Sequence, residues 1–355
     1  MEYKKSEFSK FSPDADRVIV NLEMAHNQWV DAHRELSELP VSMFWKGDES
    51  RQYLAVKNKS TDSGERLALR CDETEKILSG YKEKKAALKA RISALNSTIG
   101  DRAAMYRSLR LPVLPDKQAE ILRKLDVKGL LGNDLMVVGT NAFAAYELAC
   151  GAKFPVGVEE TEDFDLAWCK YTKVSLSRKE SAHAQEDEDE KPASTLFSIL
   201  REIDPTYKIN PRKPYQAVND AGYEVELLAA PSTHPLPANQ QFDPMASLTE
   251  QEWLLQGRPM SHVISTIRLR SCPLYVPDPR WMALHKLWLS KKAIRDPRKK
   301  PKDARQGNVL LDATRHFLAD AYPINIDFVL ELPEELRDVF NAWASDRSFD
   351  PGNPG

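Results

Sequence analysis

Two aspartates two residues apart, Asp163 and Asp165, have the type and spacing that most directly indicate chemistry in this sequence. Residues i and i+2 of a β-strand lie on the same face, so a strand through residues 161–166 would bring both carboxylates together. Adjacent carboxylates repel each other and are costly to bury unless a cation lies between them. Hard oxygen ligands suit Mg²⁺ or Mn²⁺, so the pair predicts a metal site. A solvated edge strand is the alternative interpretation.

A small-residue turn lies upstream of this pair. The apolar run that ends at Val138 is followed by Gly139, Thr140 and Asn141, and then by an alanine-rich stretch typical of a helix. Glycine lets the backbone approach a ligand closely, and the free N–H groups of a helix N-terminus bind phosphate oxygens. The turn therefore predicts phosphate binding, with Thr140 adding a hydroxyl. A plain strand–helix turn is the alternative.

A third acidic position follows in the segment 222–228, where Glu224 and Glu226 alternate with apolar residues. We favour Glu226 as the third carboxylate of the metal site, acting as a metal ligand or as general base for an attacking hydroxyl. Glu224 is interpreted as a charge on the surface of the sheet.

Two lysines are candidates for contact with a triphosphate. Lys286 interrupts the otherwise apolar helix predicted around residues 282–289, and Lys302 ends a basic run that starts at Arg298. A cation directed at the phosphates would balance charge that a metal site does not reach. The alternatives are a lysine whose stem is buried and whose ammonium reaches water, and a solvated basic loop. His285 is left out of the site, because a helical histidine is more often structural.

Together these segments resemble the polymerase-beta-type nucleotidyltransferase superfamily, and they are similar to a bacterial family of nucleotidyltransferase-fold proteins of unassigned substrate. The similarity covers most of residues 40–320 and is carried by the segments 129–132, 137–142, 145–147, 161–166, 222–227, 276–280 and 283–290.

The resemblance implies a small mixed β-sheet with flanking helices, Mg²⁺ held by two aspartates, and in-line attack of a hydroxyl on the α-phosphate of an NTP. Two positions depart from the superfamily pattern. The usual Gly-Ser turn is Gly139-Thr140 here, and the third acid, usually Asp, is Glu226. One extra methylene moves a carboxylate by about 1.5 Å, so a catalytically degenerate NTP-binding or scaffold protein of the same fold stays open as the alternative.

The remaining segments predict an α+β protein with a mainly helical N-terminal region. Residues 1–125 are expected to contain a short hairpin and long helices, and residues 126–275 the catalytic core with an acidic disordered insertion near 177–194. Residues 276–347 are expected to be helical and to complete the site, with a disordered tail at 348–355. Helices are predicted at 14–37, 196–203, 281–290 and 304–321, and a long helix or a pair of helices at 73–110.

The composition of the 355 residues is that of an ordinary globular protein, with 29% charged residues and a formal net charge of −3. No apolar run long enough to cross a membrane is present, and four scattered cysteines favour a reduced, cytoplasmic protein over a zinc protein. The acceptor is left open between RNA or tRNA, a protein and a small molecule. Basic residues at 291–302 and 81–91 are candidates for an RNA groove, and a toxin or defence role is a hypothesis by analogy.

Overall fold

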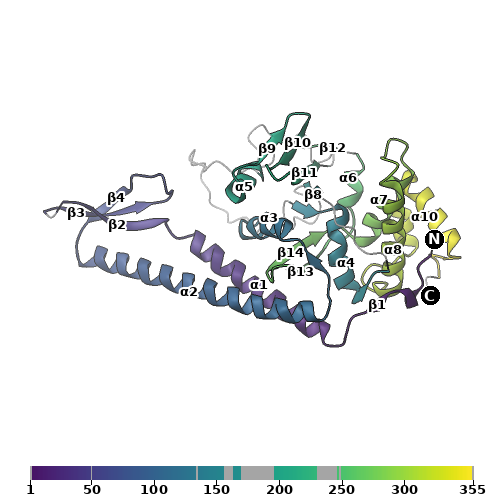
Figure 1. Ribbon diagram of the computed structural model, residues 1–355, viewed down its shortest axis with the longest axis horizontal. Helices are drawn as coiled ribbons and strands as arrows, with labels where there is room; N and C mark the ends of the chain where they lie inside the picture. Colours follow the sequence, from purple (N-terminus) through teal and green to yellow (C-terminus); the bar gives the residue numbers. More distant parts are fainter. Residues whose placement is uncertain are drawn as a thin grey trace.

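The computed structural model describes residues 2–48, 50–132, 135–155, 163–168, 196–229, 246–247 and 249–353. In this part of the chain, helices and small sheets share one hydrophobic core, and a helical arm projects from it (Figure 1). The predicted α+β class is confirmed. The insertion expected near 177–194 lies outside the described residues. No helix among those described is long and apolar enough to cross a membrane.

The central sheet has six strands, of which β8 and β11 form a parallel pair at its middle. β6 runs antiparallel to β8 on one side, and β10 and then β9 continue the sheet antiparallel to β11 on the other. The short β12 pairs in parallel with the end of β11. The strand bounds are β6 Leu135–Val137, β8 Asp163–Trp168, β9 Lys208–Asn210, β10 Lys213–Val218, β11 Glu224–Ala229 and β12 Ala246–Ser247.

Helices and a second sheet enclose the central sheet. The second sheet has the order β14-β13-β5, with antiparallel β13 and β14 and a parallel β5. The bounds are β5 Val113–Leu114, α3 Asp116–Val127, η2 Gly139–Ala142, α4 Phe143–Cys150, α5 Leu196–Ile203, α6 Gln251–Leu254, β13 Met260–Thr266 and β14 Ser271–Val276.

Four C-terminal helices pack beside this core: α7 Pro279–Lys291, α8 Lys300–Phe317, α9 Ile326–Glu331 and α10 Glu334–Asp346. α7 and α8 approach each other closely at Gly307. A Cβ there would lie 2.6 Å from Leu287 Cγ and 2.8 Å from the Ala283 carbonyl oxygen, so only glycine fits without movement.

The arm consists of α1 (Ala15–Ser37), the long α2 (Asp72–Ser108) and a small sheet between them (Figure 1). The segment predicted as a long helix or a pair of helices is one continuous helix, in keeping with its lack of proline. The predicted hairpin is also confirmed, as β2 (Ser42–Gly47) paired with β3 (Gln52–Lys57). A third strand that we did not predict, β4 (Glu65–Leu69), extends it.

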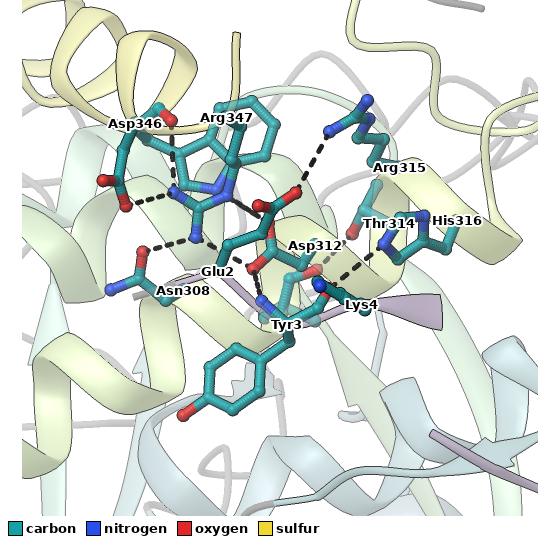
Figure 2. A network of polar contacts seen from close by, with 12 residues as sticks. Glu2, Tyr3, Lys4, Asn308, Asp312, Thr314, Arg315, His316, Asp346 and Arg347 are labelled. Carbon is teal, nitrogen blue, oxygen red and sulfur yellow. Dashed lines mark hydrogen bonds and ion pairs between the residues drawn. The ribbon is translucent and has the colours of Figure 1, made fainter. Parts of the chain in front are cut away.

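The N-terminal residues return to the core instead of staying with the arm. Strand β1 (Ser9–Lys10) pairs with β7 (Ala152–Lys153), next to α4. The Tyr3 N–H donates to Asp312 Oδ2 on α8, 2.9 Å away, where Arg347 also binds (Figure 2). Both ends of the chain are therefore fastened to α8.

The segment after α10 corrects one expectation. We predicted a disordered tail from Ser348, but Phe349 is buried and packs edge-on against Trp343, with ring centroids 5.3 Å apart. A single aromatic side chain buries enough apolar surface to hold a short polar segment on the core. The tail sequence is otherwise polar, which is why it did not predict this contact.

Candidate active site

One face of the β8–β11 pair carries the acidic residues. The parallel register places Asp163 beside Glu224 and Asp165 beside Glu226. Residues paired in register share a face, as do residues two apart on one strand, so all four acidic positions lie on the same face. The side chains of Asp163 and Asp165 lie outside the described part of the structure. The backbone alone brings the three predicted metal ligands, Asp163, Asp165 and Glu226, to neighbouring positions.

A buried glutamine on β10 joins the two glutamates. Gln216 pairs in register with Glu226, and its Nε2 donates to Glu226 Oε1 at 2.9 Å and to Glu224 Oε2 at 2.6 Å. Asn210 Nδ2 in turn donates to Gln216 Oε1 at 2.5 Å, which fixes the orientation of the amide. An amide holds the two carboxylates in place without neutralising them. The nearest cation to Glu226 among the described residues is Lys213, whose Nζ is 3.7 Å from Oε1.

This donor set fits a hard divalent cation. Carboxylate oxygens gathered on one face repel each other unless positive charge is added. Among the side chains that the structure describes, no group of three or more His, Cys, Asp or Glu residues could hold a metal ion. The predicted metal site therefore depends on Asp163 and Asp165 and stays a prediction.

The glycine turn begins beside this acidic face. Val137, the last residue of β6, pairs with Leu166, which directly follows Asp165. Gly139 then adopts a positive φ of 71°, a conformation that favours glycine, and the chain enters η2 and α4. Thr140 and Asn141 are buried in this turn. The structure thus brings the predicted phosphate-binding turn next to the predicted metal ligands.

Helix α8 contacts the turn through a side chain that we did not predict. Gln306 Nε2 donates to Thr140 Oγ1 at 3.3 Å, while Gln306 Oε1 is buried without a hydrogen-bond partner among the described residues. Lys302 lies one helical turn before Gln306 and shares its face of α8. This spacing directs Lys302 toward the side of α8 that contacts the turn.

Lys286 has a different environment. Its ammonium is buried and lies 3.0 Å from Asp303 Oδ1, and Arg295 Nε donates to the other oxygen of Asp303 at 2.8 Å. The lysine is therefore held between α7 and α8 by an ion pair, and contact with a triphosphate stays a prediction. The adjacent His285 is fully enclosed, and burial lowers its pKa to about 3, so the ring is neutral at physiological pH.

The sequence could not predict Gln216 or Gln306, because neither has a chemical type that stands out. Gln216 lies in a strand that contains Pro214, a residue that normally argues against a strand. Gln216 can be identified only once β10 is known to pair with β11 in the register that sets it opposite Glu226. Gln306 follows Lys302 by four residues, a helical spacing that places both on one face.

Comparisons with known proteins bear on this site. The sequence model of a protein family described as nucleotidyltransferase matches residues 116–324, more than half of the chain. This range contains the glycine turn, β8, β11, Lys286 and Lys302. None of the curated proteins matches the sequence significantly.

Among solved structures, the chain is similar to an antigenic nucleotidyltransferase-like protein from Paracoccidioides brasiliensis. The sequence identity is 16%, and the alignment covers 67% of this chain and 92% of that one with a TM-score of 0.33. A TM-score this low does not establish a shared arrangement of elements.

Proposed function

The chain belongs to the nucleotidyltransferase family, and on that premise we propose that it transfers a nucleoside monophosphate from an NTP to an acceptor hydroxyl. One observation carries the proposal: the parallel register of β8 and β11 sets Asp165 beside Glu226 and Asp163 beside Glu224. This acidic face lies at the start of a turn suited to phosphate, and both features support binding of a metal–nucleotide complex.

Asp163, Asp165 and Glu226 would hold Mg²⁺ or Mn²⁺, since their oxygens are the ligands that these cations prefer. When bound, the cation would supply positive charge against the triphosphate and against the charge that develops during transfer. Gln216 supports this role, because its hydrogen bond to Glu226 fixes one of the carboxylates before any ligand arrives.

In the proposed reaction, the acceptor hydroxyl oxygen attacks the α-phosphorus of the NTP. The bond from that phosphorus to the α,β-bridging oxygen breaks, and pyrophosphate leaves with the electron pair. Glu226 accepts the proton of the hydroxyl, a role that a carboxylate with a side chain one-fifth exposed can fill.

The turn and α8 would bind the triphosphate. The backbone N–H groups after Gly139 would donate to phosphate oxygens, with Thr140 and Asn141 beside them. Lys302 is our first candidate for the phosphate-binding cation, because it shares a face of α8 with Gln306, which contacts Thr140. Lys286 would have to leave Asp303 before binding phosphate.

For the acceptor we propose three classes of molecule that carry a hydroxyl: RNA or tRNA, a protein, or a small molecule. A tRNA or protein acceptor would correspond to a toxin or defence role. The second candidate function is an NTP-binding or scaffold protein without transfer activity. The glutamate at position 226 favours it, because a longer side chain displaces the third carboxylate, and catalysis is sensitive to such displacements.

The test is transfer of label from α-labelled NTPs to total RNA, total protein and a panel of small alcohols, with pyrophosphate release measured in parallel. We expect Asp163→Asn and Asp165→Asn each to reduce transfer by about 10²-fold or more, a typical effect of removing a group that stabilises the transition state. Asp220→Asn, in the turn between β10 and β11, is the matched control and should keep full activity.

Full transfer by either active-site variant would contradict the assignment. Glu226→Asp separates the two candidate functions. Faster transfer in that variant favours an enzyme whose third carboxylate is poorly placed, whereas NTP binding without transfer in both proteins favours the scaffold.

A further inference from the structure

A large cavity lies where the arm meets the core, away from the acidic face. It has a volume of about 1060 Å³ and lies among α1, α2, α3, α5 and the turn that joins β13 to β14. Figure 1 shows α3 and α5 above the crossing of α1 and α2. Its charged lining comprises four cations, Arg123, Lys124, Lys128 and Arg270, and two carboxylates, Glu120 and Glu202.

One of the two carboxylates in the lining is already paired with lysines. Glu202 is bound by Lys124 at 3.0 Å and by Lys128 at 3.4 Å. The nearby carboxylate of Asp126 is also occupied, by His26 at 3.0 Å and by Arg34 at 3.4 Å. Neither Arg123 nor Arg270 forms an ion pair with any described residue, and four cations against two carboxylates leave the lining with a net positive charge.

Arg123 is held rigidly. Its Nη1 donates to the Ser271 carbonyl oxygen at 2.6 Å, and its guanidinium lies 3.8 Å from the centroid of the Trp29 ring. Burial lowers the pKa of Arg123 to about 10, so the group remains cationic at neutral pH. Burying an arginine that has no carboxylate within ion-pair distance costs free energy. Such a cost is usual where an anionic ligand supplies the missing negative charge.

Trp29 forms the wall against which Arg123 stacks. The residue is 7% exposed and lines the cavity, and its indole Nε1 is buried within the wall. The ring holds the guanidinium of Arg123 at the cavity wall, so its positive charge is in place before a ligand binds.

We propose that this cavity binds the phosphate group of a second ligand, with Arg123 and Arg270 as donors. Guanidinium groups bind phosphate through paired hydrogen bonds, and the volume accommodates a nucleotide-sized molecule or a stretch of nucleic-acid backbone. The site is separate from the acidic face, so the proposal does not depend on the transfer reaction. Within the proposed function, the natural occupant would be a phosphorylated acceptor.

Isothermal titration calorimetry on the full chain tests the proposal, with inorganic phosphate, AMP and a short single-stranded RNA as probes. Arg270→Gln is the main variant, because Arg270 is exposed and its loss should leave the fold intact. We expect it to bind each probe at least about tenfold more weakly, the effect of losing one charge-assisted hydrogen bond. Arg123→Gln should do the same.

Two controls make the outcome specific. Arg268→Gln removes an exposed charge from the same turn, outside the cavity lining, and should bind the probes like the wild type. An Asp163→Asn/Asp165→Asn double variant should also keep phosphate binding, because those residues belong to the other site.

Phosphate binding that survives both Arg123→Gln and Arg270→Gln would overturn the proposal. So would binding that disappears in the aspartate variant, since the phosphate would then occupy the nucleotide site, or the absence of binding by all three probes. Binding of RNA with weak binding of AMP would identify a nucleic-acid backbone as the source of the phosphate, and equal binding would identify a small phosphate ester.

Discussion

Glu147 is a buried carboxyl group whose ionisation opposes folding. It lies on α4, is 4% exposed, and its Oε1 accepts a hydrogen bond from the Phe154 N–H at 2.7 Å. Burial raises the pKa of Glu147 from its ordinary value of 4.5 to about 7. Between these pH values the folded protein binds more protons than the unfolded chain, so the contribution of Glu147 to stability falls as pH rises through this window.

We therefore predict that Glu147→Gln stabilises the protein at pH 8 but not at pH 4.5. Glutamine keeps the acceptor for Phe154 and removes a cost of roughly 3 kcal/mol, the value of a pKa shift of this size. Urea unfolding at both pH values measures the difference. Glu331→Gln, at an exposed site, is the control and should show no such pH dependence. An equal effect of Glu147→Gln at both pH values would contradict the prediction.

Among individual residues, the acids and the glycine of the candidate site could be predicted from sequence. Acidic residues that alternate with apolar ones are a strong signal, as is a glycine after an apolar run. The groups that orient them could not. Gln216 and Gln306 act through their positions in the fold, and their type carries no signal of its own. The buried partner of Lys286, Asp303, is likewise visible only once α7 and α8 are packed together.

Helix α8 joins elements that are far apart in sequence. Asp312 is buried on α8 and accepts hydrogen bonds from the Tyr3 N–H, from Trp343 Nε1 at 3.0 Å and from Arg347 Nη2 at 2.9 Å (Figure 2). Asn308 binds the same nitrogen of Arg347 at 3.0 Å. This network fixes the N-terminal segment and α10 to α8.

We predict that Asp312→Asn destabilises the protein by about 3–5 kcal/mol, because it leaves the buried guanidinium of Arg347 without its main counter-charge. Thermal and urea unfolding give the value. Asp338→Asn, on the exposed face of α10, is the control. The double variant Asp312→Asn/Arg347→Met should recover part of the loss, since it removes both charges. Unchanged stability of Asp312→Asn would refute the role of the network.

Helices with a strong apolar period could be predicted from sequence, whereas β10 and β14, two strands that contain a proline, could not. The long α2 and the amphipathic α1 follow from apolar spacing and the absence of helix breakers. β14 contains Pro273, which is tolerated because this strand forms an edge of its sheet. β10 contains Pro214 at a shift in register with β9. Sequence patterns do not reveal which strands lie at an edge or carry an irregularity.

At the scale of the whole molecule, the arm and the core are joined by tertiary contacts that no local pattern predicts. The basic cavity forms only because α1 and α2 pass beneath α3 and α5, which brings Trp29 and Arg123 together across almost a hundred residues. The N-terminal segment likewise crosses from the arm to α8. We expected the N-terminal region to end at residue 125. In the structure, residues on both sides of that position pack in one hydrophobic core.

The central claim is that the acidic face of β8 and β11 binds a metal–nucleotide complex. Thermal unfolding of the wild type and of Asp163→Asn/Asp165→Asn, with each of ATP, GTP, CTP and UTP and with or without Mg²⁺, tests it most directly. A ligand at 100 times its dissociation constant stabilises by about 2.7 kcal/mol, which is a shift of several degrees at about 2–4 °C per kcal/mol. We predict a Mg²⁺-dependent shift with at least one nucleotide in the wild type and none in the variant. An equal shift in both proteins, or no shift with any nucleotide, would contradict the claim.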